Sequence, residues 1–214
     1  MRCSSLLLRF IAPLVFAGCA ASAAELFNDH DFAGWEFTTT PTTDIKAVCK
    51  LLPDGVIAAA GRPIGFIATT ASYENYRLHA EWRWSGKPGN GGVLVHISSG
   101  PKDRAWPLSL QIQTKNKNAG DLLPMAGATF AEPLTTEPGA KTPIKARTGP
   151  VDSEKPVGEW NSCDILCQNG IVEVTVNGVL QNKITQSNPH SGRVGFQFEG
   201  TPFEIRHVTL TPLD

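Results

Sequence analysis

Charged residues are scarce in this chain of 214 residues. Asp, Glu, Lys and Arg together make up 18% of it, and the formal net charge is -1. A chain so nearly neutral lacks the basic surface that attracts nucleic acid, so neutral small-molecule partners suit it better than polyanions. Beyond residue 24 no apolar run is long enough to cross a membrane as a helix, so no membrane span is expected there.

Cysteine is too scarce for a disulfide scaffold, because only Cys49, Cys163 and Cys167 follow the N-terminal segment. Cys163 and Cys167 lie four residues apart in an expected strand, which separates them by about 13 Å, too far to bond. Three buried apolar thiols are the simplest expectation, and a bond from Cys49 to one of the others is the alternative. The spacing matches no zinc site.

Amphipathic helical periodicity is missing after the N-terminal segment, whereas short alternating runs recur along the chain. Asn-Gly pairs at 169–170 and 177–178 separate three such runs, which predicts an antiparallel meander over 159–183. Asp54-Gly55 predicts a further hairpin. About a dozen short strands with regular turns indicate an all-β sandwich of two antiparallel sheets, without a second domain or an internal repeat.

Residues 115–158 are the least regular part of the chain, rich in Gly, Pro, Thr and Lys. A loop of this length in a compact domain is usually functional, and we expect it to cap one end of the sandwich. One strand is expected within it, near Met125 to Phe130. Further on, the apolar parity switches between Ile205 and Val208, which predicts a bulge near Arg206-His207.

The N-terminal segment, residues 1–24, has the features of a secretory signal peptide. Arg2 and Arg9 precede or flank a short apolar run, and Ala21-Ser-Ala23 offers a small-residue cleavage site. The run is too short for an ordinary transmembrane helix. We therefore expect an exported protein, in the periplasm or outside the cell.

A second processing site is present in the same segment. Phe16-Ala-Gly-Cys19 resembles a lipoprotein box, which would leave a lipid anchor on Cys19. In the signal-peptide interpretation, residues 25–214 form one domain, and its net charge is 17 − 20 = −3 because Arg2 and Arg9 are removed.

Polar residues occupy one face of each of four expected strands. These strands are expected at 76–84, 92–98, 108–115 and 193–199. If they are neighbours in one sheet, their polar residues share a surface; a solvated face with cross-strand ion pairs is the alternative. Solvated faces favour Thr, Lys and Glu, whereas Gln111, Gln113 and Gln197 suit hydrogen bonding to a hydroxyl-rich ligand. We therefore expect a polar cleft. The residues expected to share its surface are Arg77, His79, Glu81, Arg83, His96, Gln111, Gln113, Lys115, Gln197 and Glu199.

Single residues of this set admit two interpretations. His96 and Glu199 are the candidate acid–base groups, but His96 could be a hydrogen-bonded structural residue and Glu199 a surface carboxylate. Asp121 either contacts a ligand or stabilises a turn. Trp106, like Trp84, either stacks on a sugar ring or packs in the core.

Arg83 and Glu81 lie in the middle of an expected strand and could form a structural ion pair instead. Other catalytic patterns are missing from the chain: there is no Gly-x-Ser-x-Gly elbow, phosphate loop, His-Glu-x-x-His or Glu-x-Asp-x-x-Glu.

The chain resembles the 3-keto-disaccharide hydrolase domain family over nearly all of its length after the signal peptide. The resemblance rests on short motifs in a specific order and spacing. They are Leu26-Phe-Asn28 with Gly34-Trp35, Tyr76 to Trp84, Gly89 to His96, Trp106-Pro107, Asn118 to Asp121, Pro156 to Asn161, Val176 to Val179, Gly195 to Gly200 and Thr211-Pro-Leu213. It implies a concanavalin-like, glucanase-like jelly roll.

The resemblance also implies hydrolysis, or elimination followed by hydration, of glycosides whose C3 hydroxyl has become a ketone. Such a ketone acidifies the C2 hydrogen, so the site needs a base and donors aimed at the developing enolate oxygen. Under this hypothesis His96 or Glu199 is the base, and a divalent cation could assist, although no ligand set for it is evident. The expected substrate-binding residues are Arg83, Gln111, Gln113, Lys115, Asp121, Gln197 and Trp106.

One departure from the family pattern concerns the strand after Trp106-Pro107. Relatives usually carry Glu-x-Gln there, whereas this chain has Gln111-Ile-Gln113. An amide serves neither as a base nor as a strong metal ligand. A noncatalytic carbohydrate-binding module on the same sandwich is therefore the alternative function.

Overall fold

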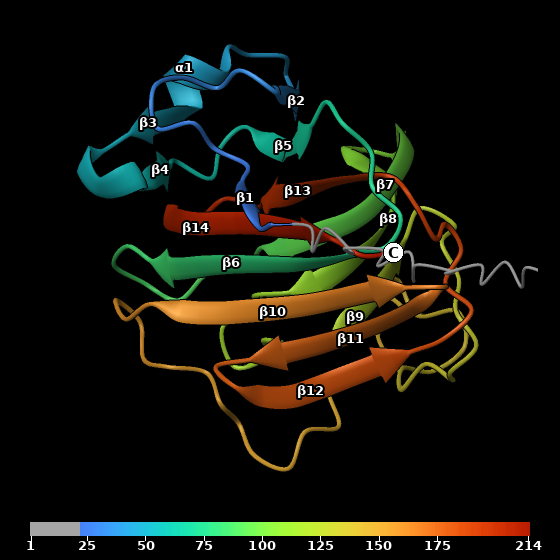
Figure 1. Ribbon diagram of the computed structural model, residues 1–214. Helices are drawn as coiled ribbons and strands as arrows, with labels where there is room; N and C mark the ends of the chain where they lie inside the picture. Colours follow the sequence, from blue (N-terminus) through green and yellow to red (C-terminus); the bar gives the residue numbers. More distant parts are fainter. Residues whose placement is uncertain (1–21) are drawn as a thin grey trace, which may run out of the picture.

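The computed structural model describes residues 22–214, and its regular secondary structure is almost entirely β-strands in two antiparallel sheets (Figure 1). This confirms the predicted all-β sandwich. The only helical elements described are one turn, α1 (Ile45–Val48), and a short 3-10 segment, η1 (Pro53–Gly55). Cys19 and most of the predicted signal peptide lie outside the described residues.

The larger sheet has eight strands in the order β12-β11-β10-β6-β14-β4-β3, with β1 added beside β14. Its strands are β1 (Ala24–Glu25), β3 (Cys49–Leu51), β4 (Ile57–Ala59), β6 (Tyr76–Trp84), β10 (Asn161–Gln168), β11 (Ile171–Val176), β12 (Val179–Ile184) and β14 (Phe203–Pro212). We call it the eight-stranded sheet.

The second sheet has six strands in the order β2-β5-β13-β7-β8-β9. Its strands are β2 (Trp35–Thr40), β5 (Ile64–Thr69), β7 (Gly92–Asp103), β8 (Trp106–Gln113), β9 (Leu122–Met125) and β13 (Arg193–Phe198). We call it the six-stranded sheet.

Alternation along the strands creates the core between the two sheets. On β6, every second side chain from Tyr76 to Trp84 is buried to 3% exposure or less, as the sequence pattern predicts. Phe198 of the six-stranded sheet packs edge-on against Phe203 of the other sheet, with ring centroids 5.3 Å apart. Since aromatic side chains bury large apolar areas, such contacts fix the distance between the sheets.

The predicted meander is confirmed as β10, β11 and β12. Both Asn-Gly turns have positive φ at each residue, 51° and 76° at 169–170 and 48° and 81° at 177–178. The hairpin at Asp54-Gly55 is also confirmed, because β3 pairs with β4 around η1. The predicted bulge is present too: the register between β14 and β6 shifts after Arg206, where His207 has φ 48°.

The long segment between β9 and β10 links the edge strands of the two sheets. Leu122 of β9 exchanges backbone hydrogen bonds with Lys145, and the N–H of Thr148 donates to the carbonyl of Gln181 in β12. The strand expected near Met125 to Phe130 is misplaced, because β9 ends at Met125. The side chain of Lys145, itself buried, donates to Asn182 Oδ1 at 2.6 Å and strengthens the link.

The three cysteines after the N-terminal segment are free and buried, which confirms the simplest expectation for them. Burial raises the pKa of the Cys49 and Cys167 thiols to about 12 and that of Cys163 still further. These thiols therefore act as small apolar groups in the core.

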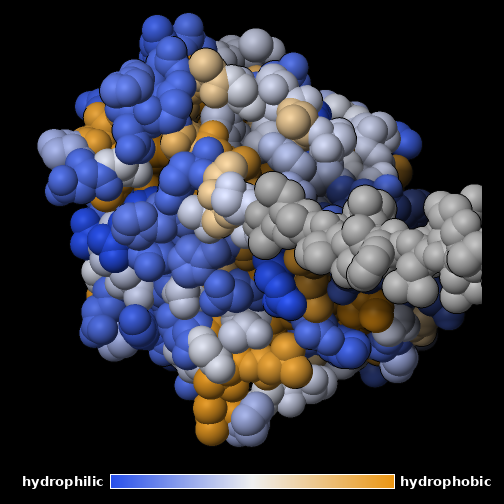
Figure 2. Space-filling model, in the orientation of Figure 1, coloured by the Kyte–Doolittle hydropathy of each residue, from blue (hydrophilic) through white to orange (hydrophobic). Residues whose placement is uncertain are grey.

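The polar face of β6 lies on the outside of the eight-stranded sheet, so the expectation that β6 neighbours the other polar strands is wrong. Arg206 donates to Glu81 at 2.6 Å, and His79 Nδ1 lies 2.7 Å from Asp164. Figure 2 shows this part of the surface as mostly hydrophilic. Here the alternative interpretation, a solvated face with cross-strand ion pairs, is confirmed.

Within the part of the chain that the structure describes, no helix is long and apolar enough to cross a membrane.

The two Asn-Gly turns provide a prediction for stability. Asn177 accepts from the Ser162 N–H at 2.8 Å and donates to the Ser153 carbonyl at 2.8 Å, whereas no side-chain bond is found for Asn169. Replacing either Asn by Ala loses the preference for positive φ, but Asn177→Ala also loses these bonds. We expect it to lower the free energy of unfolding by about 2 kcal/mol more than Asn169→Ala. Urea unfolding of both variants measures this difference, and equal losses would contradict it.

Candidate active-site cleft

A cleft of about 580 Å³ lies on the outer face of the six-stranded sheet. This volume is in the range of small-molecule sites. Six of the predicted site residues line it together. They are Trp106, Gln111, Gln113, Lys115, Gln197 and Glu199. The remaining three predicted residues, Arg83, His96 and Asp121, lie elsewhere.

The floor of the cleft follows from strand alternation. On β8, Leu110 and Ile112 belong to the core, so the intervening Gln111 and the next residue, Gln113, face outward. On β13, Phe196 and Phe198 face inward in the same way, which places Gln197 on the outer face and brings Glu199 to the cleft.

The Gln111 side chain occupies the space beside a glycine of β7, Gly92, which lies opposite Gln113 in the register. A Cβ on Gly92 would lie 2.5 Å from Gln111 Cγ, a distance that real Cβ contacts do not show. The Gln111 amide donates to Gln113 Oε1 at 2.6 Å and to the Gly91 carbonyl at 3.5 Å. These two amides therefore form a fixed pair on the floor.

Glu199 is the half-buried carboxylate of the cleft. Asn90 Nδ2 donates to Glu199 Oε2 at 2.7 Å. Burial raises the pKa of Glu199, while the positive charges of Lys115 and Arg104 act in the opposite direction. A carboxylate with a raised pKa is a stronger base, so Glu199 suits proton transfer near neutral pH.

Three amide oxygens around this carboxylate are buried without a hydrogen-bond donor in the described structure. They are Oε1 of Gln111, Oε1 of Gln197 and Oδ1 of Asn90. Buried polar atoms in native proteins nearly always have a partner, so each of these needs an explanation. A ligand rich in hydroxyl groups supplies donors of the kind that they lack.

The rim of the cleft contains residues that the sequence pattern missed. Asp103 and Arg104 come from the hairpin between β7 and β8, and Lys141 comes from the long segment after β9. Two register breaks in the β7–β8 pairing precede Asp103 and redirect the hairpin. No strand periodicity governs residues in loops. The one sequence signal for these residues was therefore the charge of side chains in expected loops.

His96 does not reach the cleft, so its prediction as a shared-surface residue is wrong. One residue of β13 lies opposite two of β7 at this point, and His96 has φ 56° in the resulting bulge. Its ring turns inward, edge-on to Tyr76 with centroids 5.9 Å apart, and Nδ1 lies 3.1 Å from the Pro189 carbonyl oxygen. Burial lowers the pKa of His96 to about 4.

Arg83 is also remote from the cleft, because it belongs to β6 of the eight-stranded sheet. Its Nε donates to Glu204 Oε2 at 2.6 Å, and its guanidinium lies 4.6 Å from the ring centroid of Trp160. Arg206 lies 4.1 Å from the same centroid. The prediction that Arg83 contacts a substrate beside Gln111 is therefore wrong. Arg83 instead forms a cross-strand ion pair, as the alternative interpretation held, but its partner is Glu204 and not Glu81.

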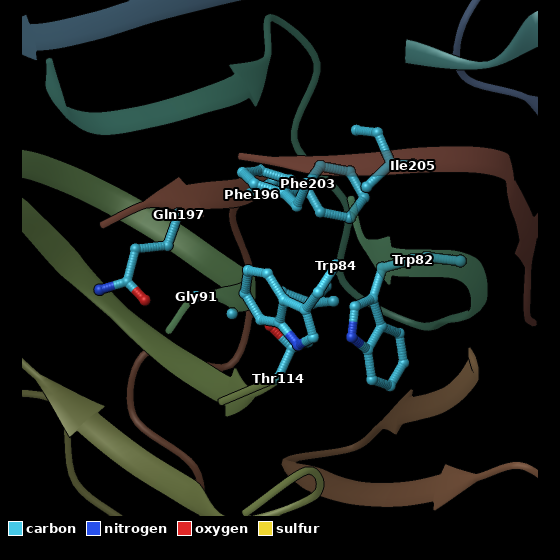
Figure 3. A pocket seen from close by; sticks show the side chains of 11 residues that line it. Trp82, Trp84, Gly91, Thr114, Phe196, Gln197, Phe203 and Ile205 are labelled. Atoms are coloured by element: carbon cyan, nitrogen blue, oxygen red, sulfur yellow. The ribbon is translucent and has the colours of Figure 1, made fainter. Parts of the chain in front are cut away.

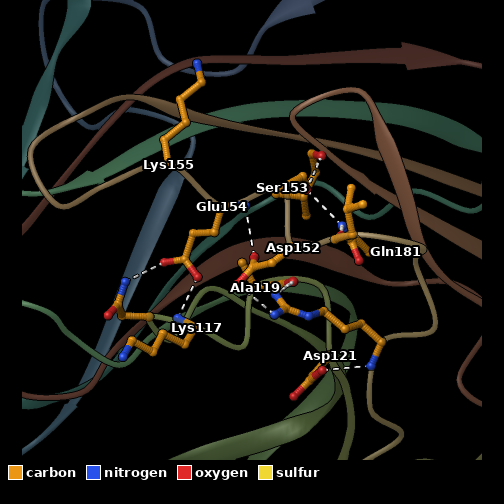
Figure 4. Close-up of polar contacts among 12 residues, drawn as sticks. Lys117, Ala119, Asp121, Asp152, Ser153, Glu154, Lys155 and Gln181 are labelled. Atoms are coloured by element: carbon orange, nitrogen blue, oxygen red, sulfur yellow. Dashed lines mark hydrogen bonds and ion pairs between the residues drawn. The ribbon is translucent and has the colours of Figure 1, made fainter.

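Asp121 stabilises the loop after β8, which was the alternative interpretation. Its Oδ1 accepts from the Arg147 N–H at 2.8 Å, and the Arg147 guanidinium reaches Asp152 at 3.0 Å (Figure 4). In the same region Glu154 accepts from the Asn116 side chain at 2.8 Å. These contacts brace the long segment that also carries part of the cleft rim.

Trp84 packs in the core and takes no part in the cleft. It borders a cavity of about 10 Å³ between the sheets, together with Trp82, Thr114 and Phe203 (Figure 3). Figure 3 shows the Gln197 amide directed away from the two tryptophans. Trp106, by contrast, forms part of the cleft wall, although only 8% of it is exposed.

Among the residues described, 22–214, no three His, Cys, Asp or Glu side chains lie close enough to hold a metal ion. The carboxylates that line the cleft are Asp103 and Glu199. We derive no step through a metal from this arrangement.

The strand order and the two packed sheets define a jelly-roll sandwich with a polar cleft on an outer face. The chain belongs to the family of 3-keto-alpha-glucoside-1,2-lyase-like domains, whose model matches residues 22–211. This confirms the resemblance drawn from the sequence motifs. Membership gives the chain a carbohydrate-related function.

Solved structures show the same fold. A predicted glycosyl hydrolase from Parabacteroides distasonis is 25% identical with a TM-score of 0.63, and the match covers 90% of this chain and 94% of that one. Carbohydrate binding module CBM66 from Bacillus subtilis is 13% identical with a TM-score of 0.57, covering 83% and 95%. LamAcat from Zobellia galactanivorans is 10% identical with a TM-score of 0.57, covering 91% and 98%. No curated protein matched the sequence.

The buried His96 predicts a pH dependence of stability. Its pKa is about 4 in the folded protein and about 6.5 when unfolded, so the unfolded state binds a proton first as pH falls. The contribution of neutral His96 to the free energy of unfolding is complete above pH 6.5 and is lost as the pH falls from 6.5 to 4. The loss amounts to about 2–3 kcal/mol at about 1.4 kcal/mol per pH unit.

Unfolding of wild type and His96→Gln at pH 7 and pH 4.5 measures this effect. We expect the variant to lose less stability on acidification than the wild type. His30→Gln, at an exposed position, is the control and should keep the wild-type dependence. Equal acid sensitivity of wild type and His96→Gln would contradict the assignment.

Proposed function

We propose that this protein cleaves 3-keto-glycosides by elimination, with Glu199 as the base and an α-linked 3-keto-glucoside as the substrate class. The observation that carries the proposal is the half-buried Glu199 carboxylate, held by Asn90 in a cleft whose floor is made of amides. The family match over residues 22–211 supports the reaction class, because its description names a 3-keto-alpha-glucoside-1,2-lyase.

In the first step the Glu199 carboxylate takes the proton from C2, and the C2–H electrons form an enolate with its negative charge on O3. The enolate then collapses: the C3 ketone re-forms, a C1–C2 double bond forms, and the C1–O bond breaks. The proton on Glu199 passes to the departing aglycone oxygen. Water adds across the double bond, with hydroxyl at C1 and hydrogen at C2, to give the free 3-keto sugar.

The charges around the cleft suit this sequence of steps. Arg104, Lys115 and Lys141 come from three separate segments, and each is exposed at the rim. Cationic groups stabilise the negative charge that develops on an enolate oxygen. The ketone, which accepts hydrogen bonds and donates none, would face this rim. The sugar hydroxyls, which donate, would face the unpaired amide oxygens of the floor.

Gln111 shapes the proposed chemistry, because the corresponding position in relatives usually carries Glu. Here the amide pairs with Gln113 and contributes hydrogen bonding instead of a second charge. Glu199 is then the half-buried carboxylate that faces the sugar, since Asp103 is exposed at the rim.

A noncatalytic sugar-binding module is the second candidate, and the same amide pair favours it. Amides that replace a carboxylate retain recognition of hydroxyl groups while removing one acid–base group. The two candidates differ in one observable, the release of the aglycone.

We also propose that the protein is exported, as the signal-like segment at residues 1–24 predicts. Residues 25–214 would then be the mature domain, with a lipid anchor at Cys19 if the second processing site is used. Fractionation of cells, followed by mass spectrometry of the mature N-terminus, distinguishes a cut near Ala23 from a modified Cys19.

Incubating the purified protein with an aryl 3-keto-α-glucoside and following the free aglycone tests the function. We expect release by the wild type and a kcat at least 100-fold lower for Glu199→Gln, since a positioned acid–base group contributes about 100- to 10,000-fold. Glu173→Gln, on the outer face of the eight-stranded sheet, should leave kcat unchanged. Saturable binding without any release would establish the binding module instead.

A further inference from the structure

A turn between β6 and β7 brings Asn90 against the candidate base. Asn90 Nδ2 donates to Oε2 of Glu199 at 2.7 Å, and both side chains line the cleft. The contact joins residues 109 positions apart in the chain. The other atom of the amide, Oδ1, is buried without a donor, so the contact to Glu199 is the one hydrogen bond described for this side chain.

The turn that carries Asn90 is held on both sides. The Thr114 N–H donates to the Gly91 carbonyl at 3.0 Å, and the Asn116 N–H donates to the Gly89 carbonyl at 3.1 Å. The flanking glycines also let the turn lie against the core, because a Cβ on Gly89 would meet the Trp84 ring at 2.4 Å. Asn90 therefore presents its amide from a fixed backbone.

We propose that Asn90 is a positioning residue that holds Oε2 of Glu199 and leaves Oε1 as the oxygen that takes the substrate proton. A carboxylate that is free to rotate presents either oxygen in many orientations, whereas one held at Oε2 keeps Oε1 aimed in one direction. This inference rests on the proposed function, because it assigns a role within the same site.

Asn90 also affects the proton affinity of Glu199. A hydrogen bond to the ionised carboxylate favours that form, so we expect loss of the Asn90 amide to raise the Glu199 pKa. The positive charges of Lys115 and Arg104 act on Glu199 in the same direction as this hydrogen bond. The other charged groups near the site are Asp103 and Lys141, which line the cleft, and Arg62 beside Gly200.

The experiment compares wild type with Asn90→Ala, Asn90→Asp and a matched control, Asn28→Ala. Asn28 is the appropriate control because its Nδ2 also donates to a carboxylate, that of Asp31, at 2.7 Å, but outside the cleft. Two quantities are measured: the pH profile of aglycone release, and the titration of the Glu199 carboxyl by carbon-13 NMR of side-chain-labelled glutamate, assigned with Glu199→Gln. Thermal unfolding shows that each variant is folded.

For Asn90→Ala we expect kcat to fall at least 30-fold while KM stays within threefold. The acid limb of the profile and the NMR titration should both move to higher pH by about one pH unit, since a hydrogen bond to a charged group has this magnitude. Asn90→Asp, of the same size, should move the titration further, because two carboxylates then compete for one proton. Asn28→Ala should change neither quantity.

An unchanged Glu199 titration in folded Asn90→Ala and Asn90→Asp overturns the assignment, whatever the activity. A moved titration together with no aglycone release by the wild type supports the contact and refutes the proposed function. The NMR measurement needs no substrate, so the two failures are separate. A loss of activity by Asn28→Ala equal to that of Asn90→Ala would show a general effect of such substitutions and overturn the proposal as well.

Discussion

The burial of alternate side chains between the two sheets is the constraint on which the cleft depends. Leu110 and Ile112 of β8, and Phe196 and Phe198 of β13, must face the core to remove their apolar surface from water. A strand that points these residues inward must point the intervening ones outward. The amide floor is therefore a geometric consequence of the packing behind it, and a one-residue slip of either strand would bury the amides and expose the core.

This constraint explains why so much of the fold could be predicted from the sequence. Alternation in β6 and the two Asn-Gly turns are local signals, and each appears in the structure as the pattern predicts. The bulge near His207 was predictable for the same reason, because a change of apolar parity has few other causes in a strand. Parity placed Gln111 and Gln197 on the polar faces of their strands. The prediction that β8 and β13 belong to one sheet, which the structure confirms, then placed both residues in one cleft.

The errors have a common origin in pairing between distant segments. Parity shows which face a residue occupies but not which sheet its strand joins, so β6 was wrongly placed beside β7 and Arg83 beside Gln111. The bulge at His96 was not predictable from local parity because it lies against a distant segment: Gly192, just before β13, approaches the β7 backbone too closely to carry a Cβ. Rim residues such as Lys141 belong to a loop whose path is set by contacts with β9 and β12, and no periodicity encodes that path.

The neutral Gln111 and the charged Glu199 are best understood together. The Gln111 amide faces Gln113 Oε1, an acceptor, at 2.6 Å, so an ionised Glu at position 111 would meet an acceptor unless the Gln113 amide turned over. A second carboxylate in the same cleft would also compete with Glu199 for the positive charges of Lys115 and Arg104. With an amide at 111, those charges act on one half-buried carboxylate, and Asn90 donates a hydrogen bond to one of its oxygens. In the proposed function, the amide at 111 thus leaves Glu199 as the acid–base group of the cleft, with Gln111 and Gln113 as a paired surface for recognition of hydroxyl groups.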